Sequence, residues 1–257
     1  MTAAERTSNR GVVIDAPSSL PAFASFAVSQ PSEPVPTVAP GEEHLLSDAM
    51  VPARKEAFAR GRAAAHAALR SLRLDHGPVL TGPNREPLWP QGAAGAISHA
   101  AGFGVALVAP TADTDGVGVD LEEFCITPAL WDQVPQPEER TWLEQIEPAE
   151  REAALVALFS AKESVFKAFF PRLGFFFGFD QATFAPTATG FLGRLSDGLD
   201  RDYPSHRTFA VTSAWHEDLV LTAVVLPKTI DHKGTAADKS IRLPGRFRPT
   251  TERIGGH

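Results

Sequence analysis

The stretch Gly116-Val-Gly-Val-Asp-Leu-Glu122 predicts both a fold element and a chemistry. Its run of small and branched apolar residues is typical of a β-strand, and the side chains of a strand alternate between its two faces. Asp120 and Glu122 therefore point to the same side. Two neighbouring carboxylates raise each other's proton affinity, and a divalent cation removes that cost. Oxygen ligands of this kind suit Mg²⁺. The alternative is a strand that leaves the core and ends in two solvated charges.

A second segment, Phe159-Ser-Ala-Lys-Glu-Ser-Val-Phe-Lys167, follows about forty residues later. It lies within a helix predicted over residues 148–170. Glu163 and Lys167 are four residues apart and share one face of that helix. The alternative is a surface ion pair worth about 0.2–0.5 kcal/mol. A capping box of Ser160 and Glu163 is excluded, because the apolar helical periodicity begins before Ser160.

The third segment, Ile97-Ser98-His99, ends a predicted strand beside the tight turn at residues 100–102. A histidine in this position is a candidate phosphate ligand or base. The alternative is a solvated side chain that forms hydrogen bonds at the turn.

The sequence on either side of these three segments predicts the other helices and strands. Apolar periodicity predicts a first helix, and clustered glycines and prolines predict a loop after it. The expected elements are helix 52–74, loop 81–95, strands 96–99, 103–108 and 117–122, helix 148–170 ending at Pro171, and strands 209–213 and 219–226. A helix combined with a hairpin thus occurs twice, which predicts two related α+β halves with a site between them.

The two ends differ from the middle of the chain. Residues 1–40 are rich in Ala, Pro and Ser, which predicts a largely extended or disordered segment, although 12–14 and 23–28 have the pattern of an edge strand. Residues 228–257 are predicted to be a disordered tail. Residues 41–115 then form an N-terminal lobe and residues 116–227 a C-terminal lobe.

Composition excludes several classes of protein. The 257 residues are 43% hydrophobic, and a net charge of −7 with a pI near 5.6 argues against a general nucleic-acid binder. The single cysteine, Cys125, permits neither an internal disulfide nor a cysteine metal site. No signal peptide and no apolar run of about 20 residues is present, so we expect a cytoplasmic protein without a membrane partner.

Together, the three segments resemble the signature of the 4'-phosphopantetheinyl transferase superfamily, in its enterobactin-synthetase and surfactin-type branch. The loop Gly82-Pro-Asn-Arg-Glu-Pro-Leu-Trp-Pro90 and the helical stretch Phe58-Ala-Arg-Gly-Arg62 are also similar to that branch. The resemblance covers roughly residues 45–185. It implies a pseudo-dimeric α+β fold of two similar lobes, with the active site in the cleft between them.

The implied reaction moves the 4'-phosphopantetheine arm of coenzyme A, a substrate, onto a serine of an apo acyl or peptidyl carrier protein and releases 3',5'-ADP. Mg²⁺, or Mn²⁺ in its place, is the implied metal. The carriers would belong to fatty-acid, polyketide or nonribosomal-peptide synthases, and the sequence does not choose among them. A monomer is expected, because one chain supplies both walls of the cleft.

The resemblance also implies a role for each matching residue. The metal ligands would be Asp120, Glu122 and Glu163. Lys167 would lie along the diphosphate and assist departure of ADP, and Ser98 and His99 would contact phosphates. Arg54 and Arg62 would meet the 3'-phosphate end, and Asn84 and Arg85 would border the adenine. The serine proton would go to Glu163 or to a metal-bound water, and the sequence leaves both open.

Other features keep two interpretations. Lys162 would face phosphate or solvent. The run Phe175-Phe-Phe-Gly-Phe179 predicts either a core strand or an apolar patch for the carrier or the pantetheine arm, and the segment from Trp131 to Trp142 is a candidate carrier-docking region. A Mg²⁺-dependent phosphodiesterase or pyrophosphatase and a non-enzymatic coenzyme A-binding module are the rival functions.

Overall fold

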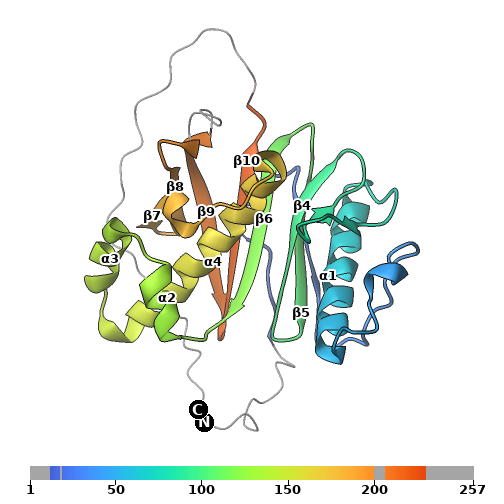
Figure 1. The fold of residues 1–257 in the computed structure, drawn as a ribbon, viewed down its shortest axis with the longest axis horizontal. Helices are drawn as coiled ribbons and strands as arrows, with labels where there is room; N and C mark the ends of the chain where they lie inside the picture. Colours follow the sequence, from blue (N-terminus) through green and yellow to red (C-terminus); the bar gives the residue numbers. More distant parts are fainter. Residues whose placement is uncertain (1–11, 18, 200–205, 230–257) are drawn as a thin grey trace.

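A computed structural model describes residues 12–17, 19–199 and 206–229. Within them, two lobes each pack one long helix across an antiparallel sheet, and the strands β4 and β6 lie side by side where the lobes meet (Figure 1). The predicted α+β architecture with two similar halves is confirmed. The division at residues 115 and 116 stays a prediction. The expected disorder of residues 1–11 and 230–257 falls outside the described residues.

Helix α1 of the N-terminal lobe spans Pro52–Ser71 and ends earlier than predicted. Proline in its first turn and a succession of alanines favour the helix. Arg73 adopts a left-handed φ of 59°, and the Leu74 amide donates back to the Leu69 carbonyl at 2.9 Å. This is the turn that usually ends a helix at glycine. The predicted end relied on Gly77, which lies beyond the actual stop.

The N-terminal sheet has the order β1-β5-β4. Strands β4 (Ala93–Ala100) and β5 (Phe103–Pro110) are joined by Ala101 and Gly102, both with positive φ, as a two-residue hairpin turn requires. Strand β1 (Ser25–Ser29) pairs with the other edge of β5, so the edge strand predicted over residues 23–28 is present. Residues 12–14, the other candidate, form no strand.

The expectation of a continuous loop over residues 81–95 is wrong in part. A short hairpin of β2 (Leu80–Thr81) and β3 (Pro87–Leu88) lies within it, and β4 already begins at Ala93. The Gly82 amide donates to the Glu86 carbonyl at 2.8 Å, which closes the turn that the glycines and prolines permit.

The C-terminal sheet has the order β6-β10-β9-β8-β7. Its strands are β6 (Thr114–Glu123), β7 (Ala182–Thr187), β8 (Gly190–Leu195), β9 (Thr208–His216) and β10 (Leu219–Pro227). Helix α4 (Pro148–Leu173) packs across β6 and β10. It continues past the predicted stop at Pro171, because a proline in the last turn removes only one helical hydrogen bond; Gly174, with a φ of 70°, then ends the helix.

Four segments of this lobe differ from the sequence prediction. Two short helices, α2 (Pro128–Gln133) and α3 (Pro137–Glu144), and the β7–β8 hairpin were not predicted. The predicted core strand over residues 175–179 is wrong. The segment is a loop leading into a 3₁₀ turn, η2 (Phe179–Gln181), and the side chains of Phe175 and Phe176 are 50% and 79% exposed.

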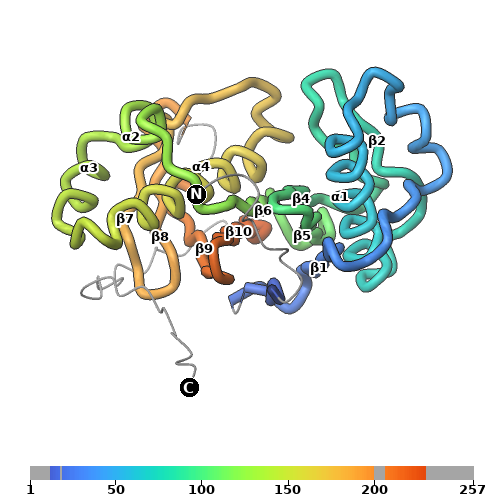
Figure 2. The backbone as a smooth tube through the Cα atoms, turned by 90° about the horizontal axis from the view of Figure 1, so that it is seen from below, coloured from blue at the N-terminus to red at the C-terminus, as the bar shows by residue number. Residues whose placement is uncertain are grey.

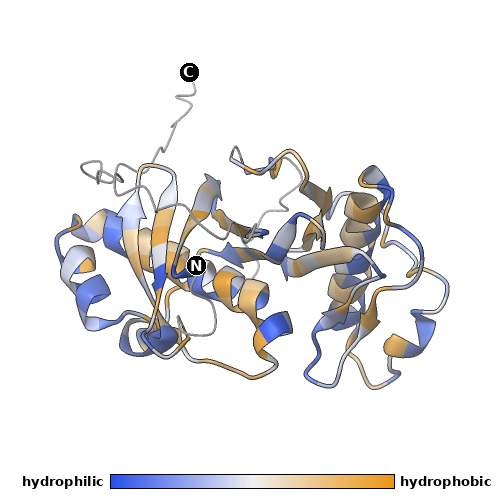
Figure 3. Ribbon diagram, turned by 90° about the horizontal axis from the view of Figure 1, so that it is seen from above, coloured by the Kyte–Doolittle hydropathy of each residue, from blue (hydrophilic) through white to orange (hydrophobic). Residues whose placement is uncertain are grey.

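A shared apolar core joins the lobes. Leu107 of β5 and Leu121 of β6 belong to the same buried cluster, which Val12 and Ile14 from the N-terminal segment also enter. The tube in Figure 2 shows β4, β5, β6 and β10 gathered in the middle of the molecule, and Figure 3 shows hydrophobic residues along the strands and both long helices. The two halves of the cleft are therefore connected through buried strands.

Each long helix approaches its sheet at a glycine. A Cβ on Gly104 of β5 would lie 2.3 Å from the Arg60 backbone carbon of α1, and a Cβ on Gly118 of β6 would lie 1.8 Å from the Ser164 carbonyl oxygen of α4. These distances exclude any larger residue at either position without displacing the helix. The glycines thus set how close each helix, with its functional side chains, lies to the cleft.

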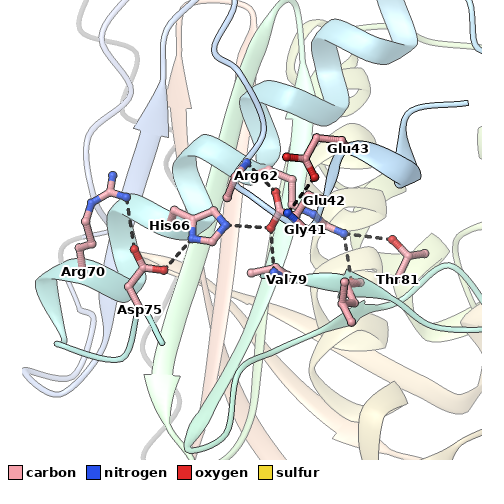
Figure 4. A network of polar contacts seen from close by, with 11 residues as sticks. Gly41, Glu42, Glu43, Arg62, His66, Arg70, Asp75, Val79 and Thr81 are labelled. Atoms are coloured by element: carbon pink, nitrogen blue, oxygen red, sulfur yellow. Dashed lines mark hydrogen bonds and ion pairs between the residues drawn. The ribbon is translucent and has the colours of Figure 1, made fainter. Parts of the chain in front are cut away.

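A polar network holds the start of the N-terminal lobe against α1 (Figure 4). The His66 ring lies between two carboxylates, with Nε2 2.8 Å from Glu42 Oε1 and Nδ1 2.7 Å from Asp75 Oδ1. Glu42 also accepts the Val79 amide at 2.7 Å and is fully buried. Donation of a hydrogen bond to the Glu42 carboxylate raises the pKa of His66, so the ring is held protonated between the two acids. The network therefore ties the chain before α1, at Glu42, to the segment after α1 that leads into β2, at Asp75 and Val79.

Candidate active site

Asp120 lies at the centre of the predicted site and is only 2% exposed. Its carboxylate accepts three hydrogen bonds from side chains. Ser98 Oγ donates to Oδ1 at 2.9 Å, Lys167 Nζ donates to Oδ1 at 2.6 Å, and Ser160 Oγ donates to Oδ2 at 2.8 Å. A buried carboxylate requires such partners. The three sequence segments of the prediction therefore meet at one side chain.

The contacts of Asp120 cross the boundary between the lobes. Ser98 comes from β4 of the N-terminal lobe, whereas Lys167 comes from α4 of the C-terminal lobe. Lys167 Nζ also lies 3.2 Å from Ser98 Oγ. Lys167 is therefore not a solvent-facing partner of Glu163, the alternative that its spacing allowed; it is paired with a buried acid at the cleft.

Glu122 and Glu163 surround Asp120 with further negative charge. Burial and repulsion from Asp120 raise the pKa of Glu122 to about 7, and Glu163 adds to that repulsion. Burial and repulsion from Asp120 also raise the pKa of Glu163. The ionised forms of Glu122 and Glu163 are therefore disfavoured, as happens to carboxylates that share one site with another acid.

The three carboxylates form a donor set of the kind that Mg²⁺ requires. All three side chains offer carboxylate oxygens, which Mg²⁺ prefers, and their mutual repulsion is the cost that a bound cation removes. In the part of the chain that the structure describes, no three His, Cys, Asp or Glu side chains are gathered at metal-ligand spacing. The chemistry of the donors thus fits Mg²⁺, while the side chains are not preassembled around one point.

Arg54 and His99 form a second polar pair next to this centre. Arg54 Nη1 lies 2.9 Å from His99 Nε2, and both residues are exposed. Desolvation by the surrounding protein and the Arg54 charge lower the pKa of His99, so the neutral ring accepts a hydrogen bond from the guanidinium. The pair joins the N-terminal end of α1 to the end of β4.

Arg62 is largely buried, in contrast to Arg54. Its Nη2 donates to the Leu80 carbonyl and to Thr81 Oγ1, both at 3.1 Å, and its guanidinium carbon lies 4.7 Å from the centre of the Phe58 ring. Its Nε is buried without a hydrogen-bond partner. The Arg62 side chain, which lines the cleft, thus contains one buried donor that forms no hydrogen bond.

Two adjoining cavities receive these side chains. One, of about 470 Å³, is lined by Arg54, Arg62 and His99 of the N-terminal lobe. The other, of about 490 Å³, lies between the lobes, with Lys167 at one side and Phe166, Phe170 and Phe176 along the wall of the C-terminal lobe. Both are lined by Arg85, and exposed Asn84 lines the second. The predicted cleft thus has a cationic part and an aromatic part.

Lys162 does not face phosphate or solvent. Its ammonium lies 2.8 Å from Glu139 Oε2, and both side chains are almost fully buried. Glu139 also accepts the Phe184 amide at 2.8 Å. Lys162 therefore joins α4, α3 and β7 inside the C-terminal lobe. The sequence carried no signal for this, because α3 was not predicted.

The segment from Trp131 to Trp142 is also partly structural. Trp142 Nε1 donates to the Phe184 carbonyl at 3.1 Å, and its ring packs beside Phe191. Trp131 lies beneath the Arg140 guanidinium, 5.5 Å from the ring centre. Both tryptophans thus serve contacts within the lobe.

Ser160 is the site residue that sequence reasoning missed. Considered only as a possible helix cap, it is instead buried in the middle of α4 and bonded to Asp120. Its position three residues before Glu163, on nearly the same helix face, was the available signal.

No helix among the described residues has the length and apolar character to cross a membrane.

Comparisons with known proteins identify the family. Residues 41–109 match the model of the 4'-phosphopantetheinyl transferase N-terminal domain, and residues 116–224 match that of the 4'-phosphopantetheinyl transferase superfamily. The chain belongs to this superfamily. It is an enzyme that transfers phosphopantetheine from coenzyme A to carrier proteins.

Several characterised relatives are similar. The 4'-phosphopantetheinyl transferase Svp of Streptomyces mobaraensis is 40% identical over 169 residues, or 64% of this chain and 68% of the relative. The 4'-phosphopantetheinyl transferase PptT of Mycobacterium tuberculosis is 34% identical over 198 residues, or 74% of this chain and 86% of the relative. Enterobactin synthase component D of Salmonella typhi is 38% identical over 132 residues, or 50% of this chain and 53% of the relative.

Proposed function

We propose that the chain carries out this transfer with Mg²⁺ held by Asp120, Glu122 and Glu163, and that the acceptor is a serine hydroxyl of an apo acyl or peptidyl carrier protein. The observation that carries the proposal is the meeting of Ser98, Asp120 and Lys167 at the boundary between the lobes. This meeting supports the proposal because it joins a buried acid to Lys167, which lines the cavity between the lobes. Mn²⁺ would be an alternative metal, because it accepts the same oxygen ligands.

Coenzyme A is expected to lie across both cavities. The cations Arg54 and Arg62 in the cavity of the N-terminal lobe suit the 3'-phosphate end, since a guanidinium contacts phosphate through two donors. Asn84 and Arg85 would border the adenine. Lys167, His99 and Ser98 would meet the diphosphate where the cavities adjoin.

The transfer needs one bond to form and one to break. The serine oxygen attacks the β-phosphorus of coenzyme A, the bond from that phosphorus to the ADP oxygen breaks, and 3',5'-ADP leaves with the electron pair. Glu163 takes the serine proton, and Lys167 stabilises the negative charge that develops on the leaving oxygen. When bound, Mg²⁺ supplies electrostatic stabilisation of the diphosphate charge.

One chain contributes both walls of the cleft, so we propose that a monomer suffices. Carriers of fatty-acid, polyketide and nonribosomal-peptide synthases present the same serine and require the same chemistry. Their identity is to be determined by assay.

The test combines the purified chain with coenzyme A, Mg²⁺ and apo carriers from each of these three classes, and measures the mass of each carrier. The expected result is a phosphopantetheine adduct on at least one carrier, lost with excess EDTA and restored by Mg²⁺. Transfer that persists in EDTA would overturn the metal proposal. Hydrolysis of coenzyme A without a carrier adduct would instead support a diphosphate hydrolase.

A further inference from the structure

The side of Asp120 that faces away from the cleft contacts two further polar side chains, directly or through one another. Thr222 of β10 is the direct cross-strand neighbour of Asp120, and both Thr222 and Ser160 are fully buried. Ser160 Oγ lies 2.9 Å from Thr222 Oγ1 and 2.8 Å from Asp120 Oδ2. Helix α4 and the strands β6 and β10 thus each contribute one polar group to a chain inside the C-terminal lobe.

The direction of these hydrogen bonds follows from counting protons. Ser160 has one hydroxyl proton, and an ionised carboxylate is a stronger acceptor than a hydroxyl. Ser160 therefore donates to Asp120 and must accept from Thr222. The resulting order is Thr222 to Ser160 to Asp120, in which each donor strengthens the next.

We infer that Ser160 and Thr222 are positioning residues that fix the plane of the Asp120 carboxylate for metal binding. This inference rests on the metal role proposed above for Asp120. The other oxygen, Oδ1, faces the cleft side, where Ser98 and Lys167 contact it. With Oδ2 held by Ser160, the carboxylate cannot rotate about its terminal bond without losing a hydrogen bond to a fully buried hydroxyl. Groups that orient a metal ligand in this way typically contribute 10- to 100-fold to metal affinity or activity.

Ser164, one turn later on α4, provides a matched comparison. It is buried to the same extent as Ser160, but its hydroxyl donates to the Ala161 carbonyl within the helix. Ser164→Ala and Ser160→Ala remove the same atom from the same helix at the same burial. Only the second removes a contact to Asp120.

Thr222 offers an independent pair of variants. Thr222→Val keeps the shape of the side chain and removes the hydroxyl, whereas Thr222→Ser keeps the hydroxyl and removes the methyl group. If the hydroxyl matters, the valine variant is impaired and the serine variant recovers most of the function. If packing matters, the order is reversed.

The experiment measures Mn²⁺ binding to each purified variant without coenzyme A, by titration followed with electron paramagnetic resonance. Thermal unfolding in EDTA and the kcat and KM of transfer are measured on the same samples. Ser160→Ala and Thr222→Val are each expected to weaken Mn²⁺ binding about tenfold or more. They should lower kcat with KM for coenzyme A nearly unchanged, because neither side chain reaches the cavities. Ser164→Ala is expected to bind as the wild type does.

Wild-type Mn²⁺ affinity in both Ser160→Ala and Thr222→Val would overturn the positioning role alone. An equal loss in Ser164→Ala would also overturn it, since the effect would then be general damage to α4. If Ser160→Ala does not fold, the Mn²⁺ affinities of Thr222→Val and Thr222→Ser test the positioning role instead. If the wild type itself binds no Mn²⁺, the proposed metal function fails and this inference fails with it.

Discussion

The two long helices have the same architectural task and opposite chemistry. Helix α1 packs on β5 at Gly104 and carries Arg54 and Arg62 to the cleft, whereas α4 packs on β6 at Gly118 and carries Glu163 beside Asp120. The α1 side of the cleft is therefore cationic, whereas α4 brings Lys167 and Glu163 to an acidic centre at Asp120. Under the function proposed above, the two copies of the fold unit would divide the reaction: α1 would hold substrate phosphate, and α4 with β6 would stabilise charge at the reacting atoms.

Removal of the central acid is expected to have the largest effect. Asp120→Ala should reduce kcat by at least about 10²-fold, because it removes a proposed metal ligand and the carboxylate to which Ser98, Ser160 and Lys167 all donate. Circular dichroism and carrier mass spectrometry on the same sample separate loss of fold from loss of transfer. A folded variant with near-normal kcat would contradict the proposed role of Asp120 as a metal ligand.

The glycine contacts test whether both helices are held in equivalent ways. Gly118→Ala and Gly104→Ala should each lower the free energy of unfolding by about 1–3 kcal/mol, since the added Cβ meets helix backbone in both cases. Gly77→Ala is the control, because a Cβ there meets nothing within 4 Å. Denaturant unfolding provides the measurement. An effect in one lobe only would show that the two packings are not equivalent.

The cationic wall should act on binding rather than on chemistry. Arg54→Ala should raise KM for coenzyme A about tenfold, or roughly 1.4 kcal/mol, with a smaller change in kcat. Lys55→Ala removes the same charge from the neighbouring position, which does not line the cavity, and serves as the control. A fall in kcat with unchanged KM would contradict the division of labour between the helices.

The smallest expected effect is a dependence of stability on pH. Because the folded protein raises the pKa of Glu122 to about 7, the native state binds more protons than the unfolded state between the ordinary carboxyl pKa and pH 7. Stability without metal therefore falls as pH rises across this window. His66, whose pKa is also raised, adds a change of the same sign, so the comparison must be made with Glu122→Gln.

Glu122→Gln should make the pH dependence of the unfolding temperature in EDTA shallower than that of the wild type. It should also remove part of the stabilisation by added Mg²⁺. Equal slopes for the two proteins would show that Glu122 is not destabilised by its acidic neighbours.

The sequence alone determined the elements with strong local signals. Strand β6 follows from its alternating apolar pattern, α1 and α4 from their periodicity, and the β4–β5 turn from its small residues. The residues of the three segments were also sufficient to indicate the family, because their order and spacing are local properties of the chain. The sequence did not predict the short helices α2 and α3 or the β7–β8 hairpin, since their formation depends on packing against α4 and β9.

Only the tertiary structure decided which charged side chains face the cleft. Lys162 and Lys167 are five residues apart on one helix, yet the first is buried against Glu139 and the second reaches Asp120. Ser160 and Ser164 look equivalent in the sequence, and only one of them contacts the acid. The physical reason is that a side chain's partner depends on which element packs against its face, and that is set by contacts between residues distant in the chain.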